Sequence, residues 1–237
     1  MAKMTPEELV EQLRAAYGSE LRSVVLYGSA AAGEHIPKRS DYNVLVLVEN
    51  LSLDQLRAVA AVARAWSEAG NPPPMTLTMR EWRSSADIFA MEYADILERH
   101  KILYGDNPFD GIRVDPKDLR LQLEHEAMGK LLRLRQGVLA TGGDARRQIE
   151  LLADSLSTIM VIFRAVLRLE GNVPAKDNVV VSQTVARNVR FDGAPFERVV
   201  RHVRGEQAIA PDEVGNVIAG YLDGMEKLVD HLDRFTG

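Results

Sequence analysis

The stretch from Val24 to Val48 limits the possible fold more than any other part of the sequence. It reads VVLYGSAAAGEHIPKRSDYNVLVLV, so two apolar runs are separated by a segment of small and polar residues. This pattern predicts two β-strands joined by a loop. Gly28 lets the backbone come close to an anion, and the small residues that follow can begin a helix whose free N–H groups point at that anion. Gly28-Ser29 between two strands therefore indicates a phosphate site.

An acidic residue stands at the head of the second strand. Asp41 lies two residues before the apolar run that begins at Asn43-Val44, and a carboxylate at this place can hold a metal against the phosphate. The segment LYGSAAAGEHIPKRSDYNVLVLV resembles the signature of the polymerase-β-type nucleotidyltransferases. It is most similar to the version found in aminoglycoside adenylyltransferases, LYGSAxxGxxxPxSDxDLLV, and follows it without a gap.

The resemblance implies a set of three carboxylates that bind Mg²⁺. Asp41 matches the first and is the candidate catalytic residue. Asn43 stands where the family has its second aspartate, and its amide offers a metal a carbonyl oxygen but no charge. The third acid belongs on the neighbouring strand, where Thr76 or Thr78 takes its place. We therefore expect a weakened Mg²⁺ site at Asp41 and Asn43. Acids elsewhere that are candidates to complete it are Glu49, Glu81, Asp87 and Glu92.

The nucleotide-binding part of the signature is better preserved. The candidate nucleotide-binding residues are Gly28, Ser29, Lys38, Arg39 and Ser40. The favoured interpretation is a nucleotidyltransferase-fold protein that binds a nucleoside triphosphate in an interdomain cleft, with transfer activity impaired or lost. Two alternatives stay open. One is an active Mg²⁺-dependent adenylyltransferase that modifies a hydroxyl of a small molecule or a protein. The other is a partner-binding module, such as a homodimer, with a vestigial cleft.

Composition limits the class of protein, its partners and its cellular compartment. With 237 residues, 46% of them hydrophobic, the chain can bury a sizeable core. A net charge of −5 gives no overall electrostatic case for a nucleic-acid partner. There are no cysteines, which excludes disulfides and thiolate metal sites, and the N-terminal segment has acids where a signal peptide needs an apolar core. We expect a cytoplasmic protein without a membrane span.

Periodicity and capping signals divide the chain into two parts. Helices are predicted at 6–17 and 53–69, strands at 75–79 and 100–104, and a mostly helical segment at 80–99. Five further helices are predicted at about 116–140, 144–170, 177–189, 195–204 and 211–234. The expected fold class is thus a small mixed α/β nucleotidyltransferase domain, residues 1–110, followed by an all-α helical bundle, residues 111–237. Aminoglycoside adenylyltransferases have the same layout.

Overall fold

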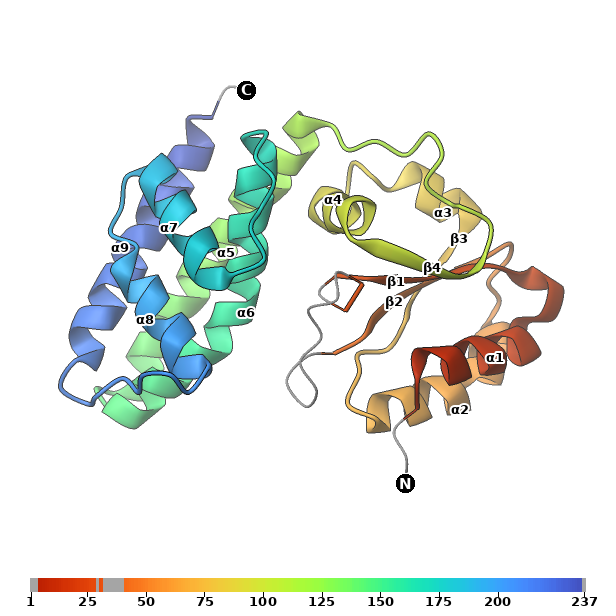
Figure 1. The fold of residues 1–237 in the computed structure, drawn as a ribbon, viewed down its shortest axis with the longest axis horizontal. Helices are drawn as coiled ribbons and strands as arrows, with labels where there is room; N and C mark the ends of the chain where they lie inside the picture. Colours follow the sequence, from red (N-terminus) through yellow and green to blue (C-terminus); the bar gives the residue numbers. More distant parts are fainter. Residues whose placement is uncertain (1–3, 29, 32–40, 236–237) are drawn as a thin grey trace. The chain divides into compact units, whose positions relative to one another are not determined.

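The computed structural model describes residues 4–28, 30–31 and 41–235. The chain divides into two compact units, Met1–Val114 and Asp115–Gly237. The first contains a mixed four-stranded sheet with helices, and the second is helical (Figure 1), which confirms the expected fold class. None of the helices within the described residues is long and apolar enough to cross a membrane.

The sheet of the first unit has the strand order β3-β2-β1-β4. Its central strands are β1 (Leu21–Tyr27) and β2 (Asn43–Val48), which pair antiparallel. β4 (His100–Gly105) pairs antiparallel with β1, and β3 (Met75–Thr78) pairs parallel with β2. The two strands predicted around the Gly28 turn are therefore the centre of the sheet.

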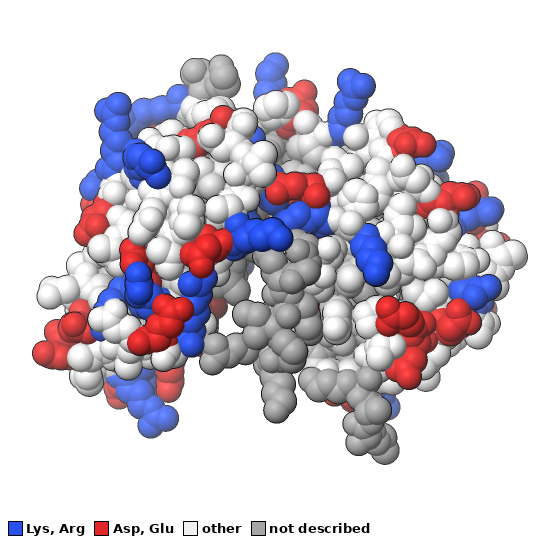
Figure 2. Space-filling view, viewed as in Figure 1, with Lys and Arg blue, Asp and Glu red and all other residues white. Residues whose placement is uncertain are grey.

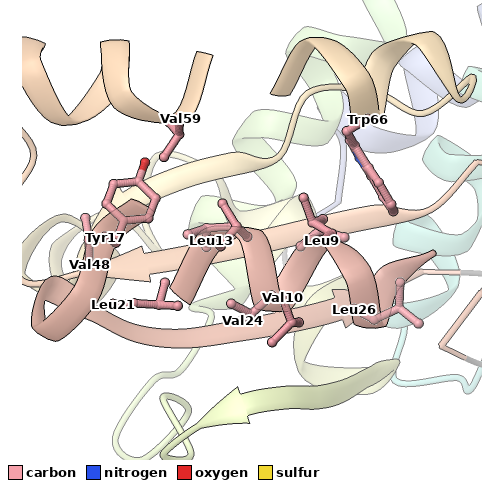
Figure 3. Packing of buried hydrophobic residues seen from close by; sticks show 12 residues of the cluster. Leu9, Val10, Leu13, Tyr17, Leu21, Val24, Leu26, Val48, Val59 and Trp66 are labelled. Carbon is pink, nitrogen blue, oxygen red and sulfur yellow. The ribbon is translucent and has the colours of Figure 1, made fainter. Parts of the chain in front are cut away.

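Helices α1 (Pro6–Tyr17) and α2 (Leu53–Glu68) cover one face of the sheet. Each begins with the predicted capping box, in which the N-cap and N3 side chains each accept from the other's backbone N–H: Thr5 with Glu8, and Ser52 with Gln55. Figure 3 shows Leu9, Leu13 and Trp66 of these helices directed at the strands, where side chains such as Val24 meet them. Burial of this apolar layer fixes which strand residues face α1 and α2.

The opposite face is covered by two short helices, α3 (Met79–Ser84) and α4 (Ala90–Glu98). The segment predicted as mostly helical, 80–99, is helical up to residue 98 except at 85–89, where the chain turns because Ser84 and Ser85 favour a turn over a helix interior. Ile88 lies in this turn and is exposed. The buried residues of this face are Val25, Leu45 and Leu47 of the sheet with Trp82, Tyr93 and Ile96 of the helices.

The second unit contains five helices within residues 115–235: α5 (Pro116–Thr141), α6 (Ala145–Leu169), α7 (Asn178–Val189), α8 (Ala194–Val203) and α9 (Val214–Asp233). They match the five helices predicted from the sequence. Phe196 is the centre of their aromatic core, since its ring lies 5.0 Å from Phe163, 5.3 Å from Phe191 and 4.3 Å from Tyr221 between centroids. The aromatic part of the core is thus built by α6, α8 and α9 together with Phe191, which lies two residues after the end of α7.

Gly105, the last residue of β4, makes a close backbone contact with β1. Its φ of +83° is in the left-handed region, and a Cβ atom there would lie 1.9 Å from the carbonyl oxygen of Arg22. Gly111 has a similar φ of +79° with nothing within 4 Å of the corresponding position. Comparing the same substitution at Gly105 and at Gly111 therefore separates the effect of steric overlap from the effect of backbone strain.

We expect Gly105→Ala to lower the free energy of unfolding of the first unit by about 3 kcal/mol, because it adds overlap with Arg22 to the left-handed strain. Gly111→Ala is the matched control and should lose about 1 kcal/mol through strain alone. Urea unfolding followed by tryptophan fluorescence measures both, since the two tryptophans, Trp66 and Trp82, lie in the first unit. Equal losses in the two variants would contradict the contact.

Candidate functional site

The candidate site is built around Gly28, which is buried at the end of β1 with a φ of +75°. Its N–H donates a 3.0 Å hydrogen bond to the carbonyl oxygen of Arg99, the residue between α4 and β4. A Cβ atom at Gly28 would lie 3.4 Å from Nδ2 of Asn43 and 3.8 Å from Oδ2 of Asp95. The turn is therefore bordered by an amide from the start of β2 and a carboxylate from α4.

The segment that carries Asp41 and Asn43 is anchored through Tyr42. The Tyr42 N–H donates to Oδ1 of Asn71 at 3.1 Å, and its ring lies 6.1 Å from that of Trp66. Asn43 is half-buried and pairs with Tyr27 of β1, whereas Asp41 is exposed just before the strand. The first acid of the signature is thus solvent-accessible, and the second position holds an amide fixed by the sheet.

Asp95 is an acidic residue near Gly28 that was not predicted from the sequence as part of the site. Arg99 Nη2 lies 2.7 Å from Asp95 Oδ1, and the two side chains are only 17% and 22% exposed. This charge-assisted bond is within α4 and its C-cap, four residues apart. The sequence did contain a signal for this ion pair. Asp95 stands four residues before Arg99, and Arg99 directly precedes the predicted strand at 100–104.

The side chain of Tyr27 lies close to two carboxylates beside the turn, and they affect its pKa. Burial, followed by the carboxylates of Asp95 and Glu92, raises the pKa of Tyr27 to about 12. Glu92 and Asp95 lie one turn apart in α4, so both approach Tyr27 from the same side of the sheet. Glu92 is the one member of the four candidate acids that contributes here.

The other candidate acids have structural roles elsewhere. Glu49 binds Arg22 at 2.9 Å, at the end of the sheet opposite Gly28. Glu81 caps α3, and hydrogen bonds from Thr78 hold the pKa of its carboxyl below the usual range. Asp87 is exposed in the turn before α4. These three acids therefore do not complete the Asp41–Asn43 set.

The neighbouring strand β3 offers no acid to the face of Asn43. Side chains alternate along a strand, so Asn43 shares its face with Leu45 and Leu47. Met75 and Leu77 pack against the cluster formed by these leucines. The β3 residues on the Asn43 face are therefore Met75 and Leu77, and not Thr76 or Thr78 as the sequence analysis expected.

A two-Mg²⁺ site needs several carboxylates to offset the charge of the ions and of the triphosphate. Within residues 4–28, 30–31 and 41–235, no group of three or more His, Cys, Asp or Glu side chains is arranged to hold a metal. Asp95 is bound by Arg99, and Asn43 carries no charge. The described donors therefore do not fit two metal ions. Ser29, Lys38, Arg39 and Ser40 lie outside the described residues and stay predictions.

The charge distribution shows no continuous basic surface on the face that Figure 2 presents. Lys and Arg side chains are interspersed there with Asp and Glu among the described residues. This agrees with the net charge of −5.

Among solved structures, the chain is similar to spectinomycin adenyltransferase AAD(9) from Enterococcus faecialis, crystallised with ATP and spectinomycin. The TM-score is 0.59 at 12% sequence identity, and the match covers 94% of this chain and 100% of that one. The chain has a nucleotidyltransferase fold. A toxin–antitoxin structure with AMP-PNP matches at a TM-score of 0.31 and 20% identity, over 45% of this chain and 78% of that one, and this likeness is too low to carry an argument. No protein-family model and no curated protein matches the sequence.

The proximity of Asp95 to Tyr27 gives a direct test of the site geometry. We expect Asp95→Asn to lower the pKa of Tyr27 from about 12 toward the ordinary value of about 10, without reaching it, because burial is the larger cause. Tyr93 is the internal control: its pKa, also about 12, is raised by burial and by Asp87 and should not change. Tyrosine-labelled NMR across alkaline pH distinguishes the two rings. An unchanged Tyr27 pKa would place Asp95 away from the turn.

Proposed function

We propose that this protein binds a nucleoside triphosphate at the Gly28 turn and that its nucleotidyl-transfer activity is lost or strongly impaired. The nucleotidyltransferase fold and the left-handed Gly28 next to the β2 segment support the binding half. The observation that carries the second half is the donor set around Gly28, an amide at Asn43 and a carboxylate at Asp95 that Arg99 neutralises.

Nucleotide binding requires fewer charged groups at the site than nucleotidyl transfer does. The residues that would contact the phosphates are the predicted Ser29, Lys38, Arg39 and Ser40, beside the Gly28 turn, and the nucleotide would bind as its Mg²⁺ complex. Asp41 is exposed and is the predicted carboxylate that would hold the Mg²⁺ of this complex. One carboxylate is sufficient to favour a bound Mg²⁺–nucleotide, whereas ordering a second ion against the attacking hydroxyl needs more negative charge.

Transfer also needs a base for the attacking hydroxyl. A misplaced or missing base lowers a rate by about 10²- to 10⁴-fold. On β3 the residues that share the face of Asn43 are apolar, and Asp95 would have to leave a 2.7 Å bond with Arg99 to accept a proton. The carboxylate closest to Gly28 is thus held in an ion pair, which supports the proposed loss of transfer.

The proposal predicts binding without turnover. ATP with Mg²⁺ should give a measurable heat in titration calorimetry, and Asp41→Ala should weaken it, because the variant removes the exposed carboxylate. Pyrophosphate release from ATP should not exceed that of the Asp41→Ala variant in a coupled assay. Release that needs Mg²⁺ and disappears in Asp41→Ala would overturn the loss of activity, and absence of nucleotide binding would overturn the proposed ligand.

A second candidate function is an active adenylyltransferase that modifies a hydroxyl of a small molecule or a protein. The observation in its favour is the Asp95 carboxylate, 3.8 Å from the Cβ position of Gly28 on a helix instead of a strand. In that case Asp95→Asn should abolish pyrophosphate release while ATP binding persists. Asp87→Asn, an exposed acid in the preceding turn, is the matched control and should leave release unchanged.

The Asn43→Asp variant, which places an acid at the second position of the signature, tests whether the amide weakens Mg²⁺ binding. We expect Asn43→Asp to lower the unfolding free energy of the metal-free protein by about 1 kcal/mol, because it places a second carboxylate beside Asp95. Mg²⁺ should reverse this loss and should stabilise the variant more than the wild type, as followed by thermal unfolding. Adding Asp41→Ala should remove the Mg²⁺ effect. Equal Mg²⁺ stabilisation of wild type and Asn43→Asp would show that the amide does not weaken the site.

A further inference from the structure

Helix α5 has two apolar faces, and one of them is exposed. The buried face packs against α6 and α9 and consists of Leu119, Leu123, Ala127, Leu131 and Leu134. The other face carries Leu121, Met128, Leu132 and Leu139, which are 64%, 41%, 47% and 81% exposed. A helix that only covers a core needs a single apolar stripe. The second stripe, defined by these four residues and called the outer stripe below, needs another explanation.

The outer stripe has the spacing of a helix–helix seam. Its members follow one another at intervals of seven, four and seven residues, and His125 and Arg135 occupy the intermediate positions of the same heptad pattern. All six positions therefore lie along one line of the helix. From Leu121 to Leu139 this line is about 27 Å long at 1.5 Å per residue. Isolated exposed apolar residues are ordinary, but four of them along one line of a helix indicate an interaction surface.

The glycines of α5 support close approach of a partner on this side. Gly137 is explained within the chain, because a Cβ atom there would lie 2.5 Å from Cδ1 of Leu151 in α6. Gly129 has nothing within 4 Å of its Cβ position. A glycine in a helix interior is less favourable than alanine by about 1 kcal/mol. Gly129 lies next to the midpoint of the outer stripe, residue 130, where two crossing helices come closest.

We propose that α5 pairs with α5 of a second copy of this chain, antiparallel, through the outer stripe. In this register Leu121 faces the partner's Leu139, and Met128 faces the partner's Leu132, so the four exposed apolar residues of each copy are covered. Gly129 of both copies then lies at the two-fold axis. The same surface patch serves both subunits, as a closed two-fold dimer requires.

Charge decides between the two directions. Glu124 borders the first half of the outer stripe and Arg135 lies in its second half. An antiparallel pair places Glu124 next to the partner's Arg135, while a parallel pair places like charges together. Within the chain these residues already bind Arg120 at 3.0 Å and Glu226 at 2.8 Å, so neither enters the seam as an isolated charge. Complementary charges at the edge of a seam set orientation more than they add affinity.

A seam between two helices of this length is small compared with the area of a stable interface, so the dimer should dissociate on dilution. Sedimentation velocity over a wide range of protein concentration tests this. The wild type should shift from dimer to monomer on dilution, and Leu132→Glu and Leu139→Glu should be monomers throughout. Leu53→Glu, at a leucine 61% exposed on α2, is the matched control and should dimerise like the wild type.

Cysteine cross-linking tests the direction of the helices. The sequence has no cysteines, so introduced thiols have no native competitors. Leu121→Cys combined with Leu139→Cys should give a covalent dimer on mild oxidation, because each thiol faces the other position of the partner. The two positions are about 27 Å apart along one helix, too far for a bond within one chain. Each single variant should stay non-covalent.

Three results would overturn the proposal. A wild type that is monomeric at every concentration would show that no second copy covers the outer stripe. A dimer that survives both glutamate variants would place the interface elsewhere. Cross-linking of Leu121→Cys alone would establish a parallel pair. The nucleotide measurements concern the first unit, so either proposal can fail without the other.

Discussion

The backbone at Gly28 is the constraint on which the first unit depends. Four segments meet there: the end of β1, the start of β2 at Asn43, the side chain of Asp95 in α4, and the carbonyl oxygen of Arg99 before β4. Only glycine adopts a φ of +75° without strain, and its N–H bond to Arg99 ties α4 to the sheet. The proposed nucleotide-binding turn is therefore also the point at which the sheet and α4 are joined.

The residues around the turn differ in how much the packing of the sheet depends on them. Asn43 is half-buried, and Met75 and Leu77 of β3 pack on the same face of the sheet, so the sheet forms here without an acid on that face. Replacing Gly28 would disturb the turn and its hydrogen bond to Arg99. Under the proposed function, the positions that packing requires and the positions that only a reaction requires are different, so one set can vary without the other.

The sequence predicts local features of this structure well and non-local ones poorly. Capping residues such as Thr5 and Ser52 act within one turn of helix, so both helix starts were predicted. Ile88 fits a helical repeat yet is exposed, because the repeat does not record that the chain turns after α3. Asp95 was missed for a similar reason: its place beside Gly28 depends on β4 pairing with β1, which periodicity within α4 cannot show.

The pairing of β1 with β4 also sets an order of assembly during synthesis. Tyr27 pairs with His100, and the N–H of Gly28 needs the carbonyl of Arg99, so these contacts join residues more than seventy positions apart. Contacts of such long range form late and slow the folding of a domain. A nascent chain that ends before His100 has the whole nucleotidyltransferase signature in its sequence but cannot close the turn. The turn at Gly28 can therefore close only after Arg99 and His100 have left the ribosome.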